Sequence, residues 1–98
     1  MSVVNRILVT ARMESGDTVD VSMKVTNRGY SAEEIAKLES RIDKEIVPVV
    51  DDTIHYQVRT WSGNGGKERK NWARIPNLEE LRHIVHEVMT PSHEEVSA

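Results

Sequence analysis

The sequence predicts an α+β fold, a two-layer sandwich in which a four-stranded antiparallel sheet carries two helices on one face, in the order ββαββα. In both halves of the chain, strand-like alternation of apolar and polar residues precedes apolar residues repeated at helical spacing. Turn residues and prolines separate these stretches. A chain of 98 residues, 38% of them apolar, is sized for one domain, which we place at residues 1–91.

A β-hairpin is predicted for residues 3–26. The segment "TVDVSMKVT" at residues 18–26 alternates strictly, with Val19, Val21, Met23 and Val25 on one face. The preceding "NRILVTARM" has the same period, although Leu8 breaks it, and "ESGD" supplies turn residues between the two strands. The polar residues of both strands should therefore share the other face of the sheet.

The first helix should begin after Ser31. Ser31 and Glu34 have the spacing of a capping box, in which each side chain bonds the backbone N–H of the other residue. An apolar stripe then follows at helical spacing, formed by Ile35, Leu38, Ile42 and Ile46. Proline cannot continue a helix without losing a hydrogen bond, so we expect Pro48 to end this one.

The second half repeats this order. "IHYQVRTW" at residues 54–61 alternates, with Ile54, Tyr56 and Val58 on one face. A glycine-rich turn follows, and "NWARI" is predicted to return as a short strand. Asn77 and Glu80 then indicate a helix start, and Pro91 its end, with an apolar stripe formed by Leu78, Leu81, Ile84, Val85, Val88 and Met89. Residues 92–98 are predicted to be a disordered acidic tail.

Residues 3–46 and 54–90 are a candidate internal repeat. Aligning them places Arg12 opposite Arg59 and Gly16 opposite Gly63. Ser-Gly turns and paired glutamates at helix starts are common, so chance explains the likeness as well as duplication does.

The composition excludes several classes of function. Without cysteine the chain has no disulfide, thiolate nucleophile or thiolate zinc site, which suits a cytoplasmic location. No membrane-length apolar segment or signal peptide is evident. The sequence shows no nucleophile elbow or phosphate loop, and we expect neither enzymatic activity nor a cofactor. His83 and His86 lie one turn apart, but on the polar side of their helix, so no metal site is predicted.

Charge is distributed unevenly along the chain. Residues 31–53 hold three basic and seven acidic side chains, whereas residues 54–74 hold five basic and one acidic. The basic segment "RTWSGNGGKERKNWAR" at residues 59–74 also contains Trp61, which parity places on the polar face of the sheet. An open antiparallel face of this composition is more often simply a solvated surface, but tryptophan is enriched at recognition sites.

Two binding hypotheses follow from this layout. The favoured one is a non-enzymatic binding or regulatory protein that contacts a protein partner, or another copy of itself, through the open sheet face and hairpin 59–74. The alternative is a nucleic-acid-binding protein, because cations neutralise phosphates and indole rings stack on unpaired bases. The predicted partner-binding residues are Arg12, His55, Gln57, Arg59, Trp61, Lys67, Arg69, Lys70 and Arg74.

The hairpin itself is predicted to be mobile from residue 62 to residue 70. Gly63, Gly65 and Gly66 lose much backbone entropy on ordering, and no apolar side chain between Ser62 and Asn71 could anchor them.

Overall fold

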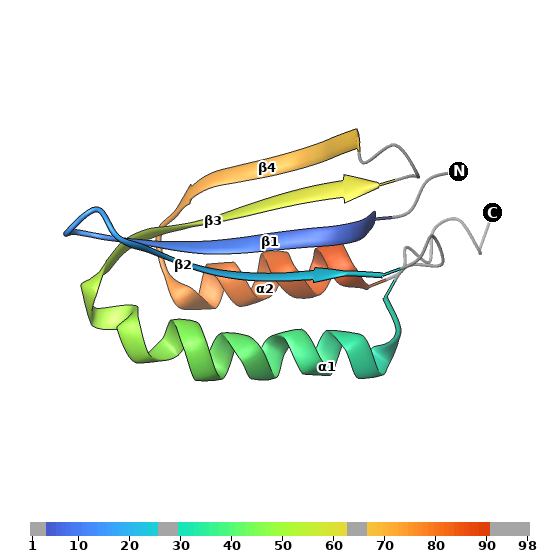
Figure 1. Ribbon diagram of the computed structural model, residues 1–98, viewed down its shortest axis with the longest axis horizontal. Coiled ribbons are helices and arrows are strands. Elements are labelled where there is room, and N and C mark those ends of the chain that lie inside the picture. The colour runs from blue at the N-terminus through green and yellow to red at the C-terminus, as the bar shows by residue number, and fades with distance from the viewer. Residues whose placement is uncertain (1–3, 26–29, 63–66, 91–98) are drawn as a thin grey trace.

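The structure, a computed structural model, describes residues 4–25, 30–62 and 67–90. It confirms the predicted two-layer α+β fold, with both helices on one face of a four-stranded antiparallel sheet (Figure 1). The elements in chain order are β1 (Val4–Met13), β2 (Thr18–Lys24), α1 (Ala32–Arg41), β3 (Thr53–Ser62), β4 (Lys67–Ile75) and α2 (Leu78–Met89). A π-helical turn (Ile42–Ile46) and a 3-10 helix (Val47–Asp52) follow α1.

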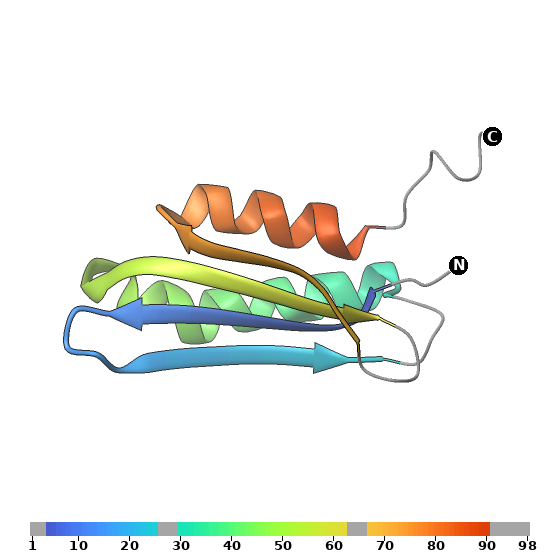
Figure 2. The ribbon, with the colours of Figure 1, turned by 90° about the horizontal axis from the view of Figure 1, so that it is seen from above.

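The strand order across the sheet is β2-β1-β3-β4. Each hairpin therefore supplies one central strand, and the two halves of the chain meet where β1 pairs with β3. β2 and β3 run parallel on the two sides of β1, because each pairs antiparallel with it, and α1 makes the connection between them across the helical face (Figures 1 and 2).

The predicted turn between β1 and β2 is confirmed. The N–H of Met13 donates to the carbonyl of Asp17 at 2.8 Å, and the N–H of Gly16 donates to that of Met13 at 2.9 Å. Gly16 has a φ of 99°, which a residue without Cβ adopts at little cost.

The core lies between the sheet and the helices and consists mainly of aliphatic residues. The inward-facing residues have the predicted parity, and among those with no exposed surface are Ile7, Val9, Val21, Leu38, Ile42, Ile46, Val58, Leu81 and Val85. Ile54 is an exception at 53% exposed. It is the extra β3 residue where the pairing with β1 shifts between His55 and Thr53, so a bulge removes it from the regular alternation.

The first helix begins as predicted, but the backbone around its predicted end at Pro48 is not α-helical. Both hydrogen bonds of the capping box are present, from the Glu34 N–H to Ser31 Oγ and from the Ser31 N–H to the Glu34 carboxylate. The prediction that Pro48 ends the helix holds only in part: α1 itself stops at Arg41, and a π turn and a 3-10 helix continue to Asp52 with a kink at Val49 (φ −109°, ψ 15°) directly after the proline. In a continued α-helix the proline ring would clash with the Lys44 carbonyl. The chain avoids this by widening to a π turn, closed by the Val47 N–H on the Ile42 carbonyl, and then tightening to a 3-10 helix.

The second helix starts at the predicted residue but with only half of a capping box. Asn77 Oδ1 accepts the N–H of Glu80 at 2.8 Å. Leu81, Val85 and Met89 are buried, and Leu78, Ile84 and Val88 pack at the edge of the core, so the predicted apolar stripe is confirmed. The helix lies against β3 and β4, at the side of the molecule opposite the edge strand β2 (Figure 2).

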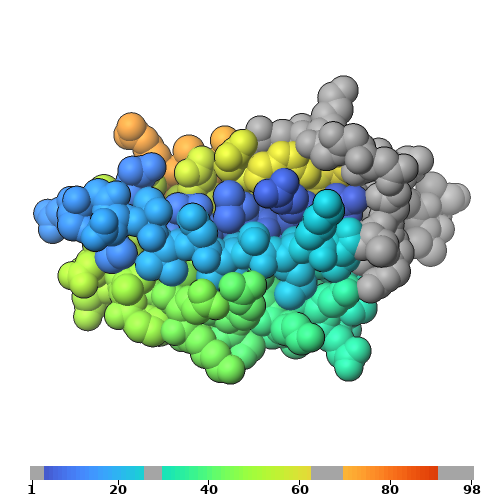
Figure 3. All heavy atoms as spheres, viewed as in Figure 1, coloured from blue at the N-terminus to red at the C-terminus, as the bar shows by residue number. Residues whose placement is uncertain are grey.

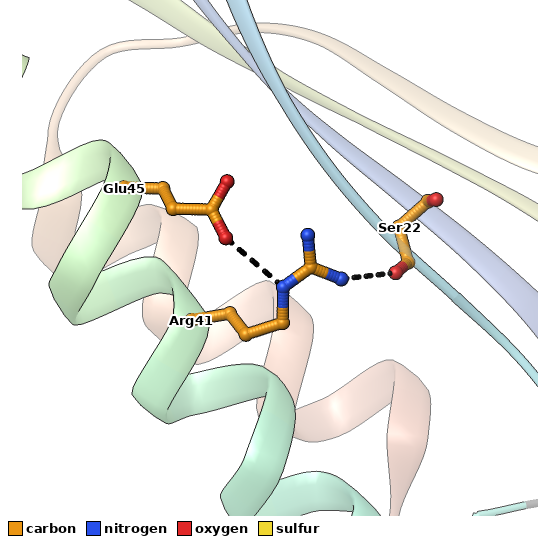
Figure 4. Close-up of polar contacts among 3 residues, drawn as sticks. All are labelled: Ser22, Arg41 and Glu45. Atoms are coloured by element: carbon orange, nitrogen blue, oxygen red, sulfur yellow. Dashed lines mark hydrogen bonds and ion pairs between the residues drawn. The ribbon is translucent and has the colours of Figure 1, made fainter.

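Arg41 joins the helical layer to the edge strand β2. Its Nη1 donates to the Ser22 carbonyl at 2.9 Å, and its Nε donates to Glu45 at 3.0 Å (Figure 4). The helical segment follows β2 along this side of the molecule (Figure 3). An edge strand presents unpaired backbone groups that other chains can pair with, and Arg41 occupies one of them.

Tyr30 makes a second contact between this strand and the chain leading into α1. Its ring is 6% exposed, and its hydroxyl donates to the Met23 carbonyl at 2.8 Å. Burial raises the pKa of the Tyr30 hydroxyl well above its ordinary value, the Glu34 carboxylate raises it further, and Arg6 opposes them. Burial also raises the pKa of Tyr56.

We expect Tyr30→Phe to cost about 1 kcal/mol of stability at neutral pH, because it removes this hydrogen bond. The cost should shrink as the pH rises above about 10, the pKa of an unfolded tyrosine, because the folded wild type resists an ionisation that the unfolded chain undergoes. Urea unfolding from about pH 8 to pH 11 would measure both curves. A difference in unfolding free energy between wild type and variant that stays constant with pH would contradict the prediction. Tyr56, whose pKa is also raised, is present in both proteins, so its ionisation does not contribute to the difference.

Candidate binding face on the open side of the sheet

The sheet face opposite the helices, here called the open face, carries the polar residues that parity predicted. They come from three strands: Arg6, Thr10 and Arg12 of β1, Asp20, Ser22 and Lys24 of β2, and His55, Gln57, Arg59 and Trp61 of β3, and the apolar Leu8 of β1 lies among them. Antiparallel pairing sets residues of adjacent strands side by side, so distant parts of the chain form one surface.

Trp61 lies on this face, but it is not the exposed aromatic residue that the sequence suggested. It is 9% exposed, since the guanidinium of Arg6 lies 4.5 Å from its ring centroid and that of Arg59 lies 4.9 Å away. Arginine planes bind indole rings by cation–π attraction and cover apolar area at the same time. At this point the exposed surface is formed by the side chains of Arg6 and Arg59, which pack over the buried Trp61 ring.

Arg6 was not among the predicted site residues, although its parity placed it on this face. It sits opposite Trp61 because the pairing of β1 with β3 shifts at Asn5, which is an extra residue between the pairs Val4–Ser62 and Arg6–Trp61. The alternation of apolar and polar residues in a strand does not show where a bulge occurs, so the sequence could not predict that Arg6 pairs with Trp61.

The other end of the open face holds Arg12 beside its register partner His55. Arg12 is exposed and His55 is partly exposed. Between the two ends, Thr10 Oγ1 donates to Asp20 at 2.8 Å and the Gln57 amide donates to Asn71 at 3.3 Å. The middle of the face thus satisfies its own polar groups.

Lys70 does not belong to the open face. It lines a pocket of about 240 Å³ on the helical side, formed by Val4, Thr60, Lys70, Trp72, Glu87 and Val88. Its ammonium lies 5.8 Å from the ring centroid of Trp72, which pairs with the core residue Val58. Because side chains two apart in a strand share a face, the position of Trp72 also determines that of Lys70.

The remaining predicted residues lie in β4. Arg74 is exposed and has a φ of 63°, where the β3–β4 pairing shifts between Ile75 and Trp72. Lys67 and Arg69 belong to the strand, but their side chains lie outside the described part of the structure. β4 is longer than the predicted strand of residues 71–75, because it starts at Lys67, with Lys67 paired to Ser62 and Glu68 to Trp61. The predicted mobility of residues 62–70 stays a prediction, and residues 63–66 lie outside the described residues.

Two arginines of the helical layer have carboxylate partners, whereas its lysines Lys37 and Lys44 are exposed without one among the described residues. On the helical layer, Arg41 pairs with Glu45 at 3.0 Å and Arg82 pairs with Asp43. On the open face, Arg6, Arg12 and Lys24 are exposed, and none has a carboxylate partner within the described residues. The described charged side chains of this face are Arg6, Arg12, Lys24 and Arg59 against Asp20, so the described part of the face has a positive net charge.

The histidines of α2 lie on its exposed side, as predicted. His83 faces Glu87 at 4.0 Å, and His86 Nδ1 lies 3.4 Å from Glu39 of α1. Within residues 4–25, 30–62 and 67–90, no group of three or more metal-binding side chains converges.

No protein-family model, no curated protein and no solved structure matches this chain. Neither helix among the described residues has the length and apolar character needed to cross a membrane.

Proposed function

We propose that this protein is a small binding module that docks an acidic segment of another protein on the open face of its sheet. The observation that carries the proposal is the set of exposed cations, Arg6, Arg12 and Lys24, which have no carboxylate partner among the described residues. Complementary charge accelerates association and selects partners more than it adds raw affinity.

The position of the tryptophans favours a protein partner over single-stranded nucleic acid. Stacking on bases needs an accessible indole face, and Trp61 is covered by two guanidiniums while Trp72 lines the pocket on the helical side. The acidic helices lie on the opposite layer, where they would repel a nucleic acid long enough to wrap around the domain.

The test is a charge reversal on the open face with a matched control on the helices. Arg12→Glu with Lys24→Glu changes two exposed cations that have no hydrogen bond or ion pair with another described side chain. Lys37→Glu with Lys44→Glu makes the same change of net charge on the helical layer, where both lysines are exposed. Arg6 is left intact because its guanidinium covers Trp61.

We expect the open-face variant to bind a glutamate-rich peptide at least about tenfold more weakly than wild type at about 50 mM salt, and the helical variant to bind within about twofold of wild type. Fluorescence anisotropy with the peptide, a single-stranded and a double-stranded oligonucleotide would measure this. Equal losses in both variants, or no binding of any acidic peptide at low salt, would overturn the proposal. Tighter binding of an oligonucleotide would replace it by nucleic-acid binding.

A further inference from the structure

The cations of the open face gather at its two ends. At one end, Arg6 lies in register between Lys24 of β2 and Trp61 of β3, and Arg59 reaches the same indole ring. At the other end, Arg12 lies in register between Thr18 and His55. The open face thus has several cations around Arg6 at one end and the single cation Arg12 at the other.

The middle of the face separates these two ends with neutral or self-paired groups. Thr10 bonds Asp20, Gln57 bonds Asn71, and Leu8 lies half-buried between Ser22 and Arg59. Asp20 adds a negative charge to this region. A ligand with evenly spaced negative charge would meet attraction at both ends and none in the middle.

The distance between the two ends follows from strand geometry. Arg6 and Arg12 belong to one strand and are an even number of residues apart, so both side chains point to the open face. At about 3.3 Å per residue, their Cα atoms lie about 20 Å apart.

We propose that the open face recognises an extended acidic segment in which two carboxylates lie six residues apart on the same side. This inference rests on the proposed function and specifies its partner. An extended peptide has the same rise and the same two-residue period as β1, so positions i and i+6 face the sheet together about 20 Å apart. Positions i+5 and i+7 place the second carboxylate on the far side.

A set of short peptides separates this spacing rule from simple charge attraction. Each peptide is uncharged except for two glutamates at i and i+5, i+6 or i+7, with blocked termini. We expect the i+6 peptide to bind wild type at least about threefold more tightly than the other two, because only it engages both ends at once. Its titration should shift the backbone amides of Arg6 and Arg12 in parallel in NMR spectra.

Arg12→Gln removes one end of the face and should abolish the preference, leaving all three peptides with the affinity of a peptide that carries one glutamate. Lys37→Gln, an exposed change on α1, should preserve it. Equal affinities of the three peptides for wild type, with the open-face charge reversal still weakening binding, would overturn the spacing rule alone. Failure of every acidic peptide to bind would overturn the proposed function as well.

Discussion

Trp61→Ala is expected to lower the free energy of unfolding by about 3–5 kcal/mol, the range for removing a buried tryptophan. The indole is 9% exposed, and the substitution removes both the buried ring and the surface on which Arg6 and Arg59 rest. Each kilocalorie lowers the melting temperature of a domain this size by about 4–8 °C. A large fraction of the variant should therefore be unfolded at temperatures below the melting temperature of the wild type.

Thermal and urea unfolding measure this loss, and Ile54→Ala is the control. Ile54 is also a large apolar residue of β3, but it is 53% exposed, so its truncation should cost less than about 1 kcal/mol. Similar costs for the two variants would mean that the arginines do not cover the ring in solution. Because Trp61→Ala threatens the fold, loss of binding in that variant would not report on the open face, and the charge reversal at Arg12 and Lys24 is the better test.

Thr60→Val is expected to cost about 2 kcal/mol although it hardly changes the size of the side chain. Thr60 is 1% exposed, and its hydroxyl both donates to the Lys70 carbonyl and accepts the Lys70 N–H, each at 3.1 Å. At this point the pairing of β3 with β4 shifts, so that Thr60 faces one residue more on β4 than a regular ladder allows. The Thr60 hydroxyl takes the place of a backbone hydrogen-bond partner there. Valine has no hydroxyl, so the backbone N–H and carbonyl of Lys70 would both lose this partner.

Thr60→Ser distinguishes hydrogen bonding from packing, since serine keeps the hydroxyl and loses the methyl group. We expect serine to be tolerated better than valine, and the Lys70 amide to exchange with solvent faster in Thr60→Val alone. A larger loss with serine than with valine would show that the methyl group matters more than the two hydrogen bonds.

Local patterns predicted the parts of this protein that depend on neighbours in the chain. The capping box of Ser31 and Glu34 is present, as is the turn at Gly16, and the inward parity of Val21 and Tyr56 holds. Lys70 lies two residues from Trp72 and shares its face on the helical side, so the two-residue period of the strand also indicates the position of Lys70. Pro48 did not mark the end of α1, because the α-helix gives way to a π turn at Ile42 and a 3-10 helix, kinked at Val49, then includes the proline.

The sequence by itself determined the order of elements, the helix starts and the face of most strand residues, because a two-residue period and a capping side chain act between residues close in the chain. Only the tertiary structure decided that β1 pairs with β3, that Arg6 covers Trp61, and that Arg41 and Arg82 are partnered while Arg12 and Lys24 are exposed without carboxylate partners among the described residues. These features depend on strand register, and single extra residues such as Asn5 and Ile54 reset that register without altering the pattern on either side.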